Sequence, residues 1–215
     1  MVTVMKKARD SRRIGLFGAS GSGKTTKALK LVEKCRRLIV FDALDDFTGK
    51  FIRTTDLSKL KAYVIKNYVR GFRIAYVPPA GSEPRALSDL SLFLRDLQKG
   101  YKFNKHQAKI TLFVDELNLS FPLGYSKSKP DNGFCFLNNQ GRHYGINIVG
   151  CSQRMSMVDM PFRANLSDLF VFRLADFNDL KAATAIIGTP YREQILNLPN
   201  YKYIFKNEEG VKCRQ

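Results

Sequence analysis

Glycines, hydroxyls and one lysine near the amino end of the chain form a pattern that binds phosphates. The stretch G-A-S-G-S-G-K-T at residues 18–25 fits G-x-x-x-x-G-K-[ST]. Its glycines allow the backbone to turn successive N–H groups inward around a triphosphate, and the start of a following helix adds partial positive charge. We expect Lys24 to reach the β- and γ-phosphates and the Thr25 hydroxyl to be a ligand of Mg²⁺. The predicted nucleotide-binding residues are Gly18, Ala19, Ser20, Gly21, Ser22, Gly23, Lys24, Thr25 and Thr26.

Two carboxylates follow an apolar run in the middle of the chain. Residues 110–114 read I-T-L-F-V, and Asp115 and Glu116 come directly after them. A buried parallel strand is a continuous apolar run, and α/β sheets bind ligands at the carboxyl ends of such strands. We expect Asp115 to hold the hydration shell of Mg²⁺ and Glu116 to orient and deprotonate an attacking water. The alternative is a strand that ends in a polar turn, but together with the phosphate loop the pair predicts a P-loop ATPase that uses ATP and Mg²⁺.

A third group of polar residues closes another apolar run. Residues 146–151 read I-N-I-V-G-C, and Ser152, Gln153 and Arg154 follow. An amide at the end of a strand that comes after the acidic strand is where a sensor of the γ-phosphate would lie, although one glutamine is not specific by itself. Asp42, after the apolar run at 38–41, is interpreted as the start of a turn rather than as a metal ligand.

The elements that must position these residues alternate between strands and helices. Apolar runs predict strands at 14–17, 37–42, 73–77, 110–114, 146–151 and 168–173, and helical spacing predicts helices at 57–68, 82–97, 134–144 and 176–187. Residues 201–213 have the pattern of a terminal hairpin around an N-E-E-G turn. The sequence therefore predicts an α/β fold, with a central, mostly parallel sheet flanked by helices and a C-terminal β-hairpin. We expect one domain over residues 1–215, with residues 1–13 as a basic N-terminal arm or short edge segment.

The composition limits the class of protein. The chain has 215 residues, and 44% of them are hydrophobic, which suits a globular domain with a sizeable core. No apolar run approaches the ~20 residues of a membrane span, and residues 1–13 lack the core of a signal peptide, so we expect a soluble protein. The four cysteines lie far apart, without a C-x-x-C pair or metal-ligand spacing to the two histidines. They are typical of reduced thiols in a cytosolic protein, and we assign no zinc site.

The charge balance points to a polyanionic partner. There are 36 Lys and Arg residues against 19 Asp and Glu residues, a formal net charge of +17. Nucleic acid is the first candidate and an acidic membrane surface the second, while a solvated basic surface is the plain alternative. Residues 118–131 are rich in proline, glycine and serine and carry Tyr125, Lys127 and Lys129, so we interpret them as a loop that contacts a nucleic-acid backbone or as a solvated linker.

Four motifs together resemble the FtsK/HerA superfamily of P-loop translocases, especially the genome-packaging ATPases of membrane-containing icosahedral viruses. They are G-A-S-G-S-G-K-T at 18–25, L-F-V-D-E at 112–116, R-H-Y-G-I at 142–146 and V-G-C-S-Q-R at 149–154. The first two, which correspond to the Walker A and Walker B motifs, are shared by many ATPases, and the last two indicate the superfamily. The resemblance covers most of residues 12–175, and it implies a RecA-like (ASCE) fold.

The resemblance also implies roles and partners. Arg142 matches the arginine finger, with Arg154 or Arg163 as substitutes, and Gln153 matches the sensor. Members form hexameric rings that translocate double-stranded DNA through a central pore, here to package a viral genome into a preformed capsid. The implied partners are double-stranded DNA, other copies of the chain, and a capsid vertex or membrane-associated viral proteins, in the host cytoplasm or the virion. The chain departs from larger members by having no membrane anchor or appended DNA-reading domain, which favours packaging over division or conjugation.

Three other functions fit the phosphate loop. A nucleotide kinase uses the same loop but needs an acceptor pocket and usually an arginine-rich lid, which we do not see. A non-hydrolytic ATP switch or scaffold protein has little use for a base at Glu116. An inovirus-type morphogenesis or extrusion ATPase commonly carries a membrane span after the ATPase domain.

Overall fold

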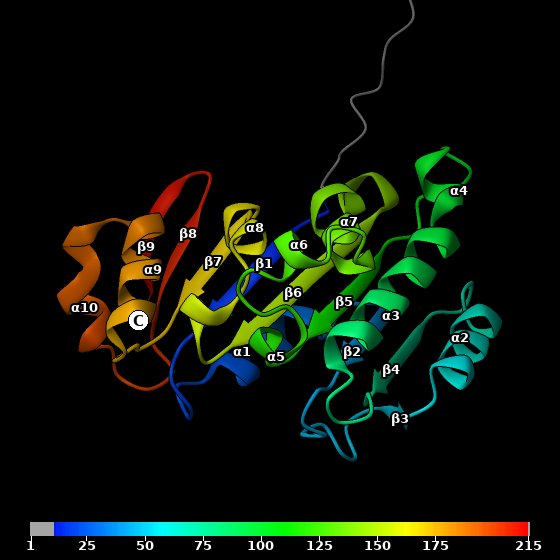
Figure 1. The fold of residues 1–215 in the computed structure, drawn as a ribbon, viewed down its shortest axis with the longest axis horizontal. Coiled ribbons are helices and arrows are strands. Elements are labelled where there is room, and N and C mark those ends of the chain that lie inside the picture. Colours follow the sequence, from blue (N-terminus) through cyan, green and yellow to red (C-terminus); the bar gives the residue numbers. More distant parts are fainter. Residues whose placement is uncertain (1–10, 215) are drawn as a thin grey trace, which may run out of the picture.

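The computed structural model describes residues 11–214, and the nine strands found there form one sheet in the order β3-β4-β2-β5-β6-β1-β7-β8-β9 (Figure 1). Neighbouring strands from β3 to β7 are parallel, whereas β7 pairs with β8 and β8 with β9 antiparallel. The predicted mostly parallel sheet with a C-terminal hairpin is confirmed. The strands are β1 (Arg13–Phe17), β2 (Arg37–Phe41), β3 (Ile52–Thr54), β4 (Phe72–Tyr76), β5 (Ile110–Val114), β6 (Ile146–Ser152), β7 (Asp168–Val171), β8 (Tyr203–Asn207) and β9 (Gly210–Arg214).

Helices lie in most of the connections between the parallel strands, as the crossovers of parallel pairing require, although β2 leads to β3 without one. Asp56, Asn132 and Asp176 each accept hydrogen bonds from the first N–H groups of the helix that follows, which fixes where that helix begins. The helices are α1 (Lys24–Val32), α2 (Leu57–Lys66), α3 (Glu83–Leu97), α4 (Lys99–Lys102), α5 (Leu117–Ser120), α6 (Tyr125–Ser128), α7 (Gly133–Gln140), α8 (Met160–Ala164), α9 (Phe177–Ile187) and α10 (Arg192–Leu196) with the 3₁₀ turns η1 (Gly141–Tyr144), η2 (Met155–Met157) and η3 (Thr189–Tyr191).

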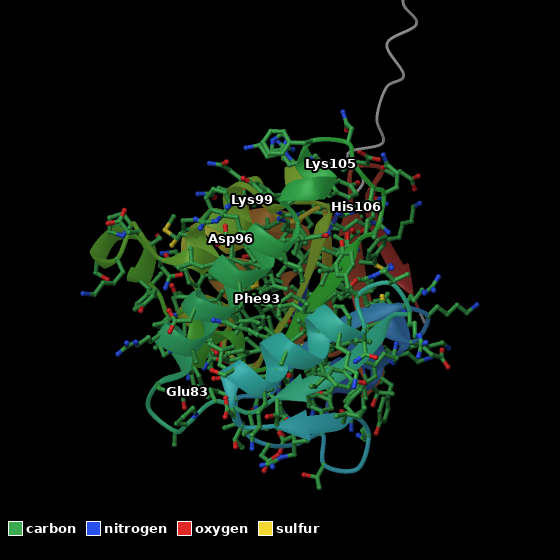
Figure 2. The ribbon with its side chains drawn as sticks, turned by 90° about the vertical axis from the view of Figure 1, so that its right-hand side faces the viewer. Glu83, Phe93, Asp96, Lys99, Lys105 and His106 are labelled. Carbon is green, nitrogen blue, oxygen red and sulfur yellow. The ribbon has the colours of Figure 1, made fainter. Side chains whose placement is uncertain are left out.

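Two apolar layers pack on the two faces of the sheet. Along β2, Leu38 and Val40 point to the layer formed with α1, whereas Ile39 and Phe41 point to the larger layer formed with α2, α3, α7 and α9. Most helices therefore lie on one face, in front of the sheet in Figure 1. Figure 2 shows this layer from the side, with Glu83 near the start of α3, Asp96 near its end and α2 beside it. The central strands are buried on both faces, and they therefore hold in place the polar residues that lie at their ends.

Some local structure differs from the sequence expectations. Residues 118–131 are not one irregular loop, because α5 and α6 lie within or overlap this stretch. The buried carboxylate of Asp159 accepts hydrogen bonds from the N–H groups of Gly124 and Ser126, and this distant residue organises the segment. Arg13 belongs to β1 rather than to the basic arm, of which residues 1–10 lie outside the described residues. The short strand β3 and helix α8 were not predicted.

Candidate nucleotide-binding site

The phosphate loop joins the carboxyl end of β1 to the start of α1. Gly21 and Gly23 have φ angles of 70° and 100°, in the left-handed region that glycine adopts without strain. Gly18 packs so closely that a Cβ there would lie 2.5 Å from Cβ of Phe172, while nothing lies within 4 Å of the corresponding position at Gly21. The Nζ of Lys24 donates to the Ala19 carbonyl at 3.0 Å, across the loop. The loop is thus held at its base and open at its tip, as a phosphate cradle requires.

The two carboxylates stand at the end of β5, and one of them meets the predicted sensor. Asp115 is buried, and its N–H donates to the Phe41 carbonyl at 3.0 Å. Glu116 has a φ of 45°, which turns the chain away from the strand. The Nε2 of Gln153 donates to Oε1 of Glu116 at 2.7 Å, because β6, which ends beside Gln153, pairs directly with β5. The residues predicted as base and sensor therefore touch, while their catalytic roles remain predictions.

The charges of the site perturb one another. Burial, followed by the charge of Glu116, raises the pKa of Asp115 to about 7. Burial lowers the pKa of Lys24, while the charges of Glu116, Cys151 and Asp115 act in the opposite direction. A cation bound between the carboxylates would stabilise the charged form of Asp115, and an anion bound at Lys24 would stabilise the charged form of the lysine. The Thr25 hydroxyl and the Asp115 carboxylate are oxygen donors of the kind Mg²⁺ takes, and so few protein ligands suit an ion that keeps several waters.

The turn predicted at Asp42 is confirmed. Its buried carboxylate accepts hydrogen bonds from the N–H groups of Asp46 at 2.9 Å and Phe47 at 3.1 Å. Within residues 11–214 there is no cluster of three or more His, Cys, Asp or Glu side chains able to hold a metal ion. All four cysteines are free thiols, two of them buried.

The three arginines considered as fingers lie in different surroundings. Arg154, next to Gln153, is paired with Asp179 at 2.9 Å and with Asp176 at 3.3 Å. Arg142, exposed on η1, and Arg163 line a cavity of about 1040 Å³ together with Arg12 and Arg13. This cavity lies at the amino ends of β1 and β7, whereas the phosphate loop lies at the carboxyl end of β1. Arg142 therefore cannot reach the phosphate site of its own chain.

Arg13 supports the turn that carries Arg142, which the sequence reading did not anticipate. Its buried guanidinium donates to the carbonyls of Leu137 at 2.7 Å, Asn138 at 3.2 Å and Ile146 at 3.3 Å. A Cβ on residue 141, a glycine, would lie 2.9 Å from this guanidinium. Burial and the nearby charge of Arg142 lower the pKa of Arg13 to about 10. The only signal in the sequence was an arginine directly before an apolar run.

The lysines predicted to contact nucleic acid are exposed. Lys127 lies in α6 and Lys129 directly after it, and Tyr125 packs edge-on against Phe121. The segment therefore presents cations from a folded base, and its contact with nucleic acid stays a prediction.

Solved structures share this fold. The genome packaging NTPase B204 from Sulfolobus turreted icosahedral virus 2, in complex with ATP-gammaS, has a TM-score of 0.69 at 15% identity, covering 95% of this chain and 97% of that chain. The chain has the fold of a P-loop ATPase. In this ATPase fold, β6 separates the strand of the phosphate loop from the strand of the carboxylates, and the RecA-like class expected from the motifs is confirmed.

Two further solved structures share the fold at lower similarity. VirB4 of Thermoanaerobacter pseudethanolicus has a TM-score of 0.59 at 10% identity, covering 94% of this chain and 89% of that chain. EssC (ATPases 2 and 3) from Geobacillus thermodenitrificans has a TM-score of 0.58 at 16% identity, covering 94% of this chain and 39% of that chain. The resemblance to FtsK/HerA-like P-loop ATPases is thus confirmed at the level of the fold. Neither a protein-family model nor a curated protein matches the sequence. Among the helices of residues 11–214, none has the length and apolar character of a membrane span.

Proposed function

We propose that this protein is a Mg²⁺-dependent ATPase that translocates double-stranded DNA and packages a viral genome into a preformed capsid. The observation that carries the proposal is the contact between Glu116 and Gln153 beside the phosphate loop and Lys24. A nucleotide-binding switch needs the loop but not an oriented carboxylate next to it. A kinase would need a second pocket for its acceptor at this edge of the sheet.

The residues of the site would divide the work of hydrolysis. Glu116 would accept the proton of the attacking water as its oxygen bonds to the γ-phosphorus, and Gln153 would hold the carboxylate in line. Lys24 would neutralise charge on the β- and γ-phosphates. Mg²⁺, held by the Thr25 hydroxyl and through water by Asp115, supplies further neutralisation of the phosphates. The bond between the γ-phosphorus and the oxygen that bridges the β- and γ-phosphates would break, giving ADP and inorganic phosphate as products.

The arginine-lined cavity at the amino ends of the strands would complete the nucleotide site of a neighbouring copy. Arg142 and Arg163 line a cavity whose four arginines give it strong positive charge, while the phosphate loop of the same chain lies beyond their reach. If copies associate head to tail, this cavity lies against the nucleotide site of the adjacent copy. Such heterologous contacts form a ring when they close on themselves. We propose a hexamer in which Arg142 stabilises charge on the neighbour's γ-phosphate.

The net charge of the chain and its structural similarity to B204 suggest the remaining partners. The surplus of +17 suits the DNA backbone, and Lys127 and Lys129 are candidate contacts. B204, which shares the fold, is described as a genome packaging NTPase. We propose that the whole chain acts as one ATPase domain, docked at a capsid vertex or on membrane-associated viral proteins, in the host cytoplasm or the virion.

A direct test measures ATP turnover by the purified protein with and without long duplex DNA, with particle imaging of the same sample. The proposal expects hydrolysis that requires Mg²⁺, rises with DNA and is lost in Glu116→Gln, in particles that are rings. Turnover that needs a small phosphoryl acceptor would instead identify a kinase. Nucleotide binding without turnover under any of these conditions would identify a switch.

A further inference from the structure

Tyr201, an exposed aromatic residue, is hydrogen-bonded to the phosphate loop and packs against it. The N–H of Tyr201 donates to the carbonyl of Ser22 at 2.8 Å. Its ring lies against Gly23, where an added Cβ would come within 2.6 Å of the ring atom Cδ1. Tyr201 is nevertheless 65% exposed, so only a part of the side chain is used for this packing.

The backbone of Tyr201 is held in an unfavourable conformation. Its φ is 65°, in the left-handed region that a tyrosine rarely adopts. Such strain persists where the surroundings enforce it, and it gathers at ligand sites. Here β8 begins two residues later, and the Nζ of Lys27 in α1 donates to the hydroxyl of Tyr203 at 2.8 Å. The chain is therefore anchored to the loop at Tyr201 and to the helix that follows the loop at Tyr203.

Tyr203 shows what a structural tyrosine looks like in the same segment. Its ring packs against the rings of Phe170 and Phe172, with centroid distances of 5.2 and 5.4 Å, and the ammonium of Lys27 lies above it. The exposed ring of Tyr201 has a face available to a ligand, and the geometry of the site says which part of a nucleotide would meet it.

The order of the strands sets the direction of a bound nucleotide. Glu116 and Gln153 follow β5 and β6, on one side of the phosphate loop, so the γ-phosphate lies on that side. The loop and the start of α1 hold the other phosphates, and the nucleoside must leave toward the opposite side, where β7 and β8 lie. Tyr201 lies two residues before the start of β8. Because β8 is antiparallel to β7, this start lies at the carboxyl ends of the parallel strands, as the phosphate loop does.

We propose that Tyr201 is the stacking platform for the nucleobase of the bound nucleotide. The proposal rests on the ATP binding proposed above, and it adds the residue that recognises the base, a part of the ligand for which the motifs name no contact. Stacking on an aromatic face is favourable for any base. Tyr201 would thus add affinity for the nucleoside without touching the phosphates.

The test compares binding of Mg·ATP and of Mg·tripolyphosphate, which lacks the nucleoside, by calorimetry on the full chain. Tyr201→Ala should weaken ATP binding by about 10- to 100-fold, the range expected from loss of one base–aromatic stack, and leave tripolyphosphate binding unchanged. Tyr201→Phe keeps the ring and should bind ATP as the wild type does. The matched control is Phe103→Ala, which removes an equally exposed ring, 66% accessible, next to α4 and should alter neither ligand.

Each other outcome has a definite meaning. Equal weakening of both ligands in Tyr201→Ala would show that the ring supports the loop, and it would overturn the platform while leaving the proposed ATPase intact. Unchanged ATP binding in Tyr201→Ala would overturn the platform in the same way. Wild-type protein that binds neither ATP nor tripolyphosphate would overturn the proposed function and the platform with it.

Discussion

Replacing Arg13 with methionine removes a buried cation that satisfies the carbonyls at the end of α7. The guanidinium donates to Leu137 O at 2.7 Å and to Asn138 O at 3.2 Å, and it is only 4% exposed. A hydrogen bond from a charged donor is worth ~1.5–3 kcal/mol, and a carbonyl left buried without any donor costs ~1–3 kcal/mol. Leu137 O would keep the hydrogen bond that it accepts from the N–H of Gly141, so the second cost applies to it only in part.

An opposing effect reduces the loss. Burial and the charge of Arg142 lower the pKa of Arg13 to about 10, and at about 1.4 kcal/mol for each pKa unit the charged form carries a penalty of roughly 3 kcal/mol. Methionine removes this penalty and fills part of the volume. We therefore expect Arg13→Met to lower the free energy of unfolding by about 2–4 kcal/mol.

Urea unfolding followed by circular dichroism measures this difference against a matched control. Arg36 also donates to backbone carbonyls, those of Arg70 at 3.1 Å and Val69 at 3.2 Å, but at an exposed site where water can replace it. Arg36→Met should change the unfolding free energy by less than about 0.5 kcal/mol. Equal midpoints for Arg13→Met and Arg36→Met would refute the reasoning, because they would show that burial of the guanidinium has no net effect.

The other predictions concern the nucleotide and DNA contacts. Lys24→Ala should abolish hydrolysis and weaken ATP binding in a folded protein, as turnover and binding assays will show, and normal turnover would exclude the assigned phosphate site. Glu116→Gln should bind Mg·ATP but lose about 10²–10⁴ in single-turnover rate, and a normal rate would mean that another group is the base. Replacing Lys127 and Lys129 with alanine should reduce the slope of log K against log salt for duplex DNA by about 2, and an unchanged slope would return the segment to a linker role.

The strands and the position of the phosphate loop between β1 and α1 could be predicted because their signals are local. The run at 110–114 is buried over its whole length, and Asp176 caps α9 within its own turn, so neighbouring residues decide both elements. The pairing of β5 with β6 then follows from the fold class and brings Glu116 to Gln153.

The remaining structure depends on contacts between distant residues. Asp159 fixes the backbone of Gly124 from 35 positions away, and no local pattern in 118–131 reveals that partner. Arg13 reaches carbonyls more than 120 positions later in the chain, so its sequence neighbours indicate only a basic arm. Tyr201 is likewise defined by a contact with the phosphate loop, which a hairpin pattern cannot contain.

The most direct test of the account mixes two inactive variants, because its central claim is that each site is completed by the neighbouring copy. Arg142→Ala should bind ATP and lose about 10³–10⁵ in hydrolysis rate, while Glu116→Gln binds ATP and lacks the base. In a mixed ring, some interfaces pair an intact Glu116 with an intact Arg142 from the adjacent copy. The account predicts that the mixture regains ATPase activity that neither pure variant has. Full activity of pure Arg142→Ala, or a mixture of exchanged subunits as inactive as its components, would contradict it.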